Sequence, residues 1–233
     1  MAESNQFCSI NPQSYMKWTP WQLAKWELAK WEGKILHGNG GMGQLWAYKR
    51  GWVSYNRLRI LSSANLQQIP PDFLGCVAFN EVGGDPPLIK HYGVLRERQY
   101  VPKTPDPMAT SEGAIKIQLR NALSVMGYKG APLNHAQQND LTNCLETDVF
   151  NIDIVAKFLR QMILFDYPRA NTRVLSDEQF IVAGSRYNRG TARSLKDLQS
   201  SIAAPQGVLQ RDWSSYGRAM MGHRAEVRKL LGI

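Results

Sequence analysis

The chain has 233 residues, of which 43% are hydrophobic and 20% charged. This length and composition exclude a disordered tail and a small domain that needs staples to fold. The 28 basic and 19 acidic residues give a formal net charge of +9, which favours nucleic acid, anionic lipid or an acidic cell wall as partners. Because the basic residues are scattered, charge alone does not choose among these partners, and it is also compatible with a basic protein that binds none of them.

Cysteine and histidine spacing gives no sign of a disulfide scaffold or a metal site. The chain has three cysteines, which are far apart: Cys8, Cys76 and Cys144. The four histidines have no ligand spacing: His37, His91, His135 and His223. Since no Cys-x-x-Cys pair or Cys/His cluster occurs, we expect free thiols, no metal and no cofactor.

Neither a membrane span nor a signal peptide is expected. No apolar run reaches the roughly 20 residues that a spanning helix needs. The N-terminal sequence MAESNQFCSINP lacks a basic stretch followed by an apolar one. The sequence therefore predicts synthesis in the cytoplasm, and a target elsewhere would require delivery of the protein.

The first predicted element is a Trp-rich helix. Thr19 is a suitable N-cap, Pro20 suits the first helical position, and Gly33 ends the apolar periodicity. We predict that residues 1–60 form a Trp-rich helical extension packed on a domain of residues 61–233. An adaptor and a wall-binding element are the alternative roles for this extension.

The following elements are also mostly helical. Mixed apolar spacing predicts a helix over 53–66, and Pro70-Pro71 opens a compact helix from Asp72 to Glu81. Loops and a small hairpin near 91–100 are expected within 83–107, where prolines and β-branched residues recur. Further helices are predicted at 114–127, 136–144, 151–165, 176–188, 192–202 and 215–231. The sequence therefore predicts a mainly α fold.

Glu81 is the first candidate for chemistry. It closes an apolar helix, where the negative end of the helix dipole and the apolar neighbours disfavour an ionised carboxylate. A carboxyl group that keeps its proton near neutral pH can protonate a leaving oxygen. A Glu at a frayed, exposed helix end is the alternative interpretation.

Two later segments add polar groups at helix ends. Ser111-x-Gly113 precedes an amphipathic stretch and either caps a helix or brings a hydroxyl group to a cleft. Tyr187-Asn188-x-Gly190 ends a predicted helix, where it forms a plain C-cap or holds a carboxyl group and a sugar amide.

Taken in order, these segments resemble the lysozyme-like lytic transglycosylase family, which includes goose-type lysozymes. Glu81 matches the catalytic Glu that ends a helix in that family. The other matching residues are Ser111, Gly113, Ile117 and Ala122, then Asn151, Ile152, Phe158 and Leu159, and finally Tyr187, Asn188 and Gly190. The resemblance covers about residues 70–190 and implies a lysozyme-like α+β domain with a small hairpin.

The sequence departs from the family pattern at three positions. Lys116 replaces a Gln that usually lines the sugar cleft, and Val82 replaces a Ser that often follows the catalytic Glu. Asp148 is one residue out of register with the family's Asp-Pro, and no Pro follows it. The chain is therefore interpreted as a divergent member.

The resemblance implies cleavage of the β-1,4 bond between N-acetylmuramic acid and N-acetylglucosamine in peptidoglycan. Glu81 would be the general acid, and Tyr187 would hydrogen-bond or orient it. Ser111, Gly113, Lys116 and Asn188 would bind the saccharide. A lytic transglycosylase needs one carboxyl group, whereas a muramidase needs a second, for which the candidates are Asp85, Glu97, Asp106 and Glu112.

A wall-cleaving enzyme without a signal peptide implies delivery from the bacterial cytoplasm to the periplasm or cell wall of a target cell. A type VI secretion effector and a phage endolysin are two expected classes, and a domain cut from a longer protein is the third possibility. Peptidoglycan strands are the expected partner, together with a cognate immunity protein for an effector. The alternative is a non-catalytic basic helical protein that binds nucleic acid or the cell wall, although no nucleic-acid-binding motif supports it.

Overall fold

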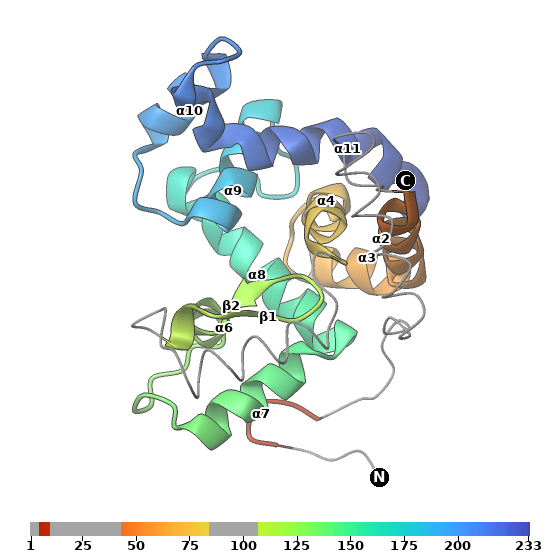
Figure 1. The fold of residues 1–233 in the computed structure, drawn as a ribbon, viewed down its shortest axis with the longest axis vertical. Coiled ribbons are helices and arrows are strands. Elements are labelled where there is room, and N and C mark those ends of the chain that lie inside the picture. The colour runs from red at the N-terminus through yellow and green to blue at the C-terminus, as the bar shows by residue number, and fades with distance from the viewer. Residues whose placement is uncertain (1–4, 10–42, 84–106) are drawn as a thin grey trace, which may run out of the picture.

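The computed structural model describes residues 5–9, 43–83 and 107–233, and most of these residues are helical. The mainly α class is therefore confirmed (Figure 1). Two predicted elements lie outside the described residues, namely the helix from Thr19 to Gly33 and the hairpin near 91–100. Within the described ranges, no helix has the length and apolar character needed to cross a membrane.

The first two described helices are α2 (Gly43–Tyr55) and α3 (Arg57–Leu66). The sequence predicted a single helix over 53–66, but the chain changes direction at Asn56 and forms two. The Asn56 side chain is fully buried, and its Nδ2 donates to Asp148 Oδ2 over 2.9 Å. This tertiary hydrogen bond, invisible to local periodicity, fixes the joint between the helices.

Helix α2 contributes to the same hydrophobic core as the rest of the described chain. Trp52 and Val53 are buried and belong to one cluster with Phe73, which lies in the helix that begins at Pro71. The predicted boundary at residue 60 falls inside α3. The division into an extension and a main domain stays a prediction.

Helix α4 (Pro71–Glu81) lies at the centre of the fold and confirms the helix predicted over 72–81. Pro70 is its N-cap and Pro71 its first residue, where proline's missing N–H removes no helical hydrogen bond. All residues from Asp72 to Phe79 are buried. Glu81, by contrast, is half-buried, because α4 reaches the surface there.

A small antiparallel hairpin precedes the C-terminal half. Its strands pair Ser111 with Gln118 and Glu112 with Ile117. The predicted helix over 114–127 is therefore wrong in its first part, where the chain turns back on itself. The elements here are η2 (Pro107–Ala109), β1 (Ser111–Glu112), β2 (Ile117–Gln118) and α6 (Leu119–Val125).

The remaining α-helices match the predicted helices within three residues at each end, whereas the short η3 was not predicted. Capping boxes begin three of the helices, at Asn134, Ser176 and Ser194. The helices are α7 (His135–Leu145), α8 (Asp148–Asp166), α9 (Asp177–Arg189), α10 (Leu195–Ala203) and α11 (Ser215–Leu231), with η3 (Leu209–Ser214) before the last.

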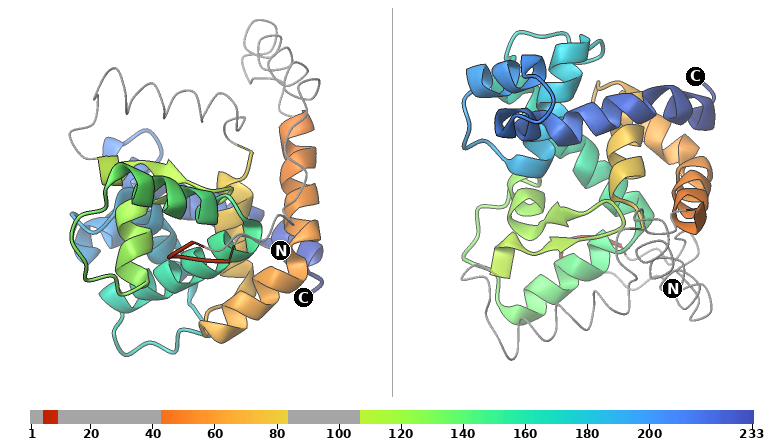
Figure 2. Two further views of the ribbon diagram at one scale, coloured as in Figure 1. Left: turned by 90° about the horizontal axis from the view of Figure 1, so that it is seen from below. Right: turned by 45° about the horizontal axis from the view of Figure 1, so that its top comes forward.

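Helix α11 lies across α4 and α9, as two views show (Figures 1 and 2). A small residue permits the crossing, because a Cβ on Gly217 would lie 2.0 Å from the Ile181 carbonyl oxygen. The buried Asp72 carboxylate at the start of α4 accepts from Arg224 Nε of α11 over 2.8 Å. These contacts bring Tyr216, in the first turn of α11, to the end of α4.

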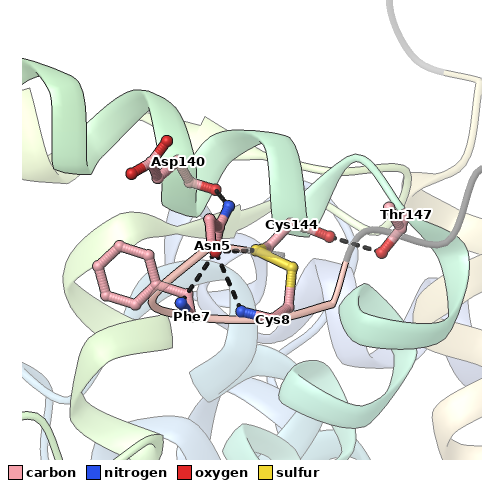
Figure 3. Close-up of a disulfide and its surroundings, with 6 residues drawn as sticks. All are labelled: Asn5, Phe7, Cys8, Asp140, Cys144 and Thr147. Carbon is pink, nitrogen blue, oxygen red and sulfur yellow. Dashed lines mark hydrogen bonds between the residues drawn. A yellow bond between two sulfur atoms is a disulfide. The ribbon is translucent and has the colours of Figure 1, made fainter. Parts of the chain in front are cut away.

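The expectation of free thiols is wrong for two of the three cysteines. Cys8 and Cys144 form a disulfide, with 5.9 Å between their Cα atoms (Figure 3). Asn5 supports the bonded segment, since its Nδ2 donates to Asp140 O over 3.0 Å and its Oδ1 accepts from the Cys8 amide over 3.1 Å. Cys76 is buried and free, as predicted.

Candidate active site

A cavity of about 710 Å³ opens beside the end of α4. Its described walls come from the hairpin, α6, α8 and α9 together with the loop after α9. Of the residues that the sequence predicted for the site, it is lined by Glu81, Ser111, Lys116, Tyr187, Asn188 and Gly190. Segments that are up to about a hundred residues apart thus meet around one space.

Glu81 is held by a tyrosine that the sequence did not single out. The Tyr216 hydroxyl donates to Glu81 Oε1 over 2.7 Å. Burial, and next the charge of Glu81, raise the pKa of Tyr216 well above its usual value, so its hydroxyl keeps the proton that it donates. Because a donor to a carboxylate favours the ionised form, Tyr216 stabilises Glu81 as an anion.

Lys49 of α2 packs against the last turn of α4, which ends at Glu81, and is only 5% exposed. Its Nζ donates to the carbonyl oxygens of Phe79 over 2.8 Å and of Asn80 over 2.7 Å. These carbonyls lie in the last turn of α4, where no helical N–H is available to them. Burial lowers the pKa of Lys49 to about 8, although the charge of Glu81 acts in the opposite direction.

Tyr187 was expected to hydrogen-bond or orient Glu81, but its hydroxyl group donates to a different acceptor. Its hydroxyl donates to the backbone carbonyl of Lys116 over 2.7 Å, so it ties α9 to the hairpin, while Tyr216 donates to Glu81. The Tyr187 ring lies between those of Phe158 and Tyr216, at centroid distances of 5.8 Å and 6.2 Å. Burial, and next the charge of Glu81, raise the pKa of Tyr187 well above its usual value.

The hairpin is fixed by Asn151, one of the residues of the sequence pattern. Its side chain accepts from the Ile115 amide over 2.8 Å and donates to the Ile115 carbonyl over 3.0 Å. Gly113 has a φ of +87°, and a Cβ there would lie 2.3 Å from Asn151 Nδ2. Gly113, predicted to bind substrate, is buried and allows this close packing, whereas Ser111 and Lys116 line the cavity.

A buried ion pair fixes the loop that closes the other side of the cavity. Arg186 makes a two-pronged salt bridge with Asp166, at 2.7 Å and 2.8 Å, and its Nη1 donates to the Arg193 carbonyl over 2.7 Å. Both side chains of the pair are almost fully buried. This network joins Arg186 to Arg193. It thereby holds the two exposed residues between them that line the cavity, Asn188 and Gly190.

The cavity wall is rich in positive charge and polar groups. Lys116, Arg120 and Arg189 line it, and Glu81 is the one acidic residue among its described lining residues. Such a wall attracts an anionic ligand, and its amide and hydroxyl groups suit a ligand rich in hydroxyl groups.

The candidates for a second carboxylate are not gathered at the cavity in the described chain. Asp85, Glu97 and Asp106 lie outside the described residues, and Glu112 is 3% exposed on β1. No group of three or more His, Cys, Asp or Glu side chains in the described ranges has the arrangement of a metal site.

Lys49 and Tyr216 are the site residues that sequence reasoning missed. Lys49 falls in a stretch without strong helical periodicity, and Tyr216 is one of several apolar or aromatic residues in a regular amphipathic helix. No local pattern indicates that either side chain reaches α4. Their positions follow only from the packing of α2 and α11 on that helix.

Comparison of the chain with protein-family models, curated proteins and solved structures finds no match. A carboxyl group beside a polar, cationic cavity, with a tyrosine donor and a buried ammonium group behind it, is suited to proton transfer.

Proposed function

We propose that the protein is a peptidoglycan glycosidase that cleaves the β-1,4 bond between N-acetylmuramic acid and N-acetylglucosamine, with Glu81 as general acid. The observation that carries the proposal is the position of Glu81: it ends the buried central helix, borders the cavity, and accepts a hydrogen bond from Tyr216. A carboxyl group in such a position is what proton donation to a glycosidic oxygen requires.

The cavity supports a saccharide as the ligand. Its volume of about 710 Å³ lies within the roughly 300–1,000 Å³ typical of small-molecule sites. Gln118, Asn121 and Asn188 offer amide groups to sugar hydroxyls and acetamido groups. The cations Lys116 and Arg189 complement the carboxylates that peptidoglycan stem peptides carry.

The residues that resemble the lytic transglycosylase and goose-type lysozyme family support the same proposal. Glu81, Ser111, Tyr187 and Asn188 all border the cavity, and Asn151 holds the hairpin beside it. We therefore also propose a lysozyme-like α+β arrangement for this domain, in which the hairpin forms one wall of the substrate cleft.

The first chemical step is the same for both enzyme classes under consideration. Glu81 gives its proton to the glycosidic oxygen while the bond from that oxygen to C1 of muramic acid breaks, and the bonding electrons remain on the oxygen. In a lytic transglycosylase, the 6-hydroxyl of the same muramic acid then attacks C1 and returns a proton to Glu81. In a muramidase, water attacks instead, with help from a second carboxylate.

The disulfide supports action outside a reducing cytoplasm. Disulfides form and persist in oxidising places such as the bacterial periplasm and the cell exterior. The Cys8–Cys144 bond is therefore in keeping with a protein made in the bacterial cytoplasm and delivered to the periplasm or wall of a target cell. A secretion effector with a cognate immunity protein and a phage endolysin remain the two proposed classes.

The proposal is tested by the release of soluble fragments from dye-labelled peptidoglycan. Wild type and Glu178→Gln are expected to release dye, because Glu178 is an exposed carboxylate of α9 that does not line the cavity. Glu81→Gln keeps the shape but not the acid and is expected to lose at least about 99% of the activity. No release by wild type, together with tight DNA binding that weakens steeply with salt, would favour the nucleic-acid alternative instead.

A further inference from the structure

A buried ammonium group, that of Lys49, lies at the end of the central helix and has no role in the acid step described above. Lys49 is 5% exposed, and its Nζ lies 2.8 Å and 2.7 Å from two carbonyl oxygens of the last turn of α4. Burying an ammonium group costs free energy, so it persists only where hydrogen bonds and charges compensate it. Here the two carbonyls and the neighbouring Glu81 carboxylate offset part of that cost.

The position of Lys49 matters because of what happens to Glu81 when it gives up its proton. The acid becomes a carboxylate at the C-terminal end of a helix, where the dipole's negative end disfavours an anion. An ammonium group that binds the last carbonyls cancels part of that negative end and adds a positive charge near the new anion. Interactions that strengthen as the charge forms lower the barrier of the step.

We propose that Lys49 is a positioning residue for Glu81: it fixes the last turn of α4 through two carbonyls and stabilises the carboxylate that proton donation leaves behind. Its effect on turnover rests on the proposed function, but its effect on the ionisation of Glu81 does not. Lys49 does not line the cavity, so it acts through Glu81 and not on the saccharide.

Other ionisable groups of the described chain face this pair from each neighbouring element. From the hairpin, Lys116 repels Lys49, and from α9 and α11, Tyr187 and Tyr216 lie beside Glu81. Burial is the main reason why the pKa of His223 in α11 is lowered, and the charge of Lys49 lowers it further. Lys49 differs from Lys116 in being buried against α4 itself, so its charge is screened less by water.

The first test needs no enzymatic activity. Protein labelled with ¹³C at glutamate side-chain carboxyl groups is titrated by NMR, and Glu81→Gln identifies the Glu81 signal. The variant Lys49→Gln keeps a hydrogen-bond donor without the charge, and Lys49→Met removes both. We expect the midpoint of the Glu81 titration to lie about 1 pH unit higher in both variants than in wild type, and to return towards wild type in Lys49→Arg. Unchanged midpoints would overturn the proposal, and Lys49→Gln carries the test if Lys49→Met does not fold.

The second test follows turnover against pH. Because Glu81 must be protonated to act, activity falls as the pH rises through its titration. Lys49→Gln is expected to move this fall to higher pH and to lower kcat at acidic pH about tenfold, with KM for peptidoglycan unchanged. Lys157→Gln, at an exposed lysine of α8, is the matched control and is expected to behave as wild type. A general loss of activity with no shift of the pH profile would contradict the proposed role.

The two tests separate the two proposals. If wild type cleaves no peptidoglycan but the NMR midpoint moves as expected, the proposed function fails and the Lys49–Glu81 coupling stands. If wild type cleaves peptidoglycan but neither the midpoint nor the pH profile moves, the role of Lys49 fails and the proposed function stands.

Discussion

The Tyr216 hydroxyl donates to Oε1 of Glu81 over 2.7 Å, although the two residues are 135 positions apart. The contact joins the end of the central helix to the first turn of α11. The middle of α11 is tied to the start of α4 through Arg224 and Asp72. Packing of one helix against another thus sets the orientation of the proposed acid. Its surroundings lie on elements that local sequence patterns do not connect.

Replacing Tyr216 by Phe removes the donor to Glu81 and keeps the ring that packs beside Tyr187. Since hydrogen bonds to charged groups contribute roughly 1.5–3 kcal/mol, we expect kcat on peptidoglycan to fall about 10–100-fold. The unfolding free energy measured with urea should fall by no more than about 3 kcal/mol, the upper end of that range. The control is Tyr167→Phe, which removes an exposed hydrogen bond to Glu178 and should leave kcat unchanged. Equal kcat values for the two variants would contradict the role of Tyr216.

Gly113 and Gly127 form a matched pair for testing the hairpin. Both have positive φ angles, +87° and +69°. At Gly113 a Cβ would collide with the Asn151 side chain and with the Leu145 carbonyl oxygen, whereas at Gly127 it would meet nothing within 4 Å. Gly127→Ala should therefore lower the unfolding free energy by about 1 kcal/mol, through backbone strain alone. Gly113→Ala should lower it by about 2 kcal/mol more, because the Asn151–Ile115 hydrogen bonds must shift. Urea unfolding measures both, and equal losses would show that the packing around Asn151 is not tight.

Lys49 gives a pH dependence of stability whose sign can be worked out. The pKa of Lys49 is lowered to about 8 in the folded protein, from 10.5 in an unfolded chain. Between these values the unfolded state binds more protons, so the unfolding free energy rises with pH through this window. The rise attributable to Lys49 is up to about 3 kcal/mol.

The measurement for Lys49 is the difference in unfolding free energy between wild type and Lys49→Met from pH 6 to pH 11. Taking the difference removes the contributions of other groups that titrate in this range. The difference should shift in favour of wild type from about pH 8 to 10.5 and be flat below pH 7. A difference that is flat throughout, or that shifts the other way, would show that Lys49 is not buried as an ammonium group.

The disulfide is expected to stabilise the fold. It closes a loop across a sequence separation of 136 residues, for which the chain-entropy model gives up to about 5 kcal/mol. Reduction with dithiothreitol, or Cys8→Ser, should lower the melting temperature by several degrees. In Cys8→Ser, reductant should have no further effect, because Cys144 has lost the cysteine to which it is bonded in wild type. A melting temperature that does not respond to reduction would contradict the bond.

Helix positions were predicted well where the sequence carries a clear start signal or an unbroken apolar periodicity. Pro70-Pro71 marked the start of α4, and its uninterrupted apolar run predicted the helix that ends at Glu81. The final helix was predicted with the observed bounds because its periodicity runs unbroken over 215–231. Each of the four short motifs contributes at least one residue to the lining of the cavity, although each motif alone is common.

What the sequence did not predict depends on distant contacts. The hairpin at 111–118 was predicted partly as helix, because the side chain that fixes its turn, Asn151, lies 36 residues beyond Ile115. The bond between Cys8 and Cys144 follows no spacing rule, since its partners come together only after α7 has packed. Lys49 and Tyr216 were missed for the same reason.

The most direct test of the central claim is mass spectrometry of the products that wild type and Glu81→Gln release from purified peptidoglycan. We expect wild type alone to release disaccharide muropeptides that carry a new end on N-acetylmuramic acid. An anhydro end, one water lighter, identifies a lytic transglycosylase, and a reducing end identifies a muramidase. Products that end on N-acetylglucosamine, equal release by both proteins, or no release at all would contradict Glu81 as the acid that cleaves this bond.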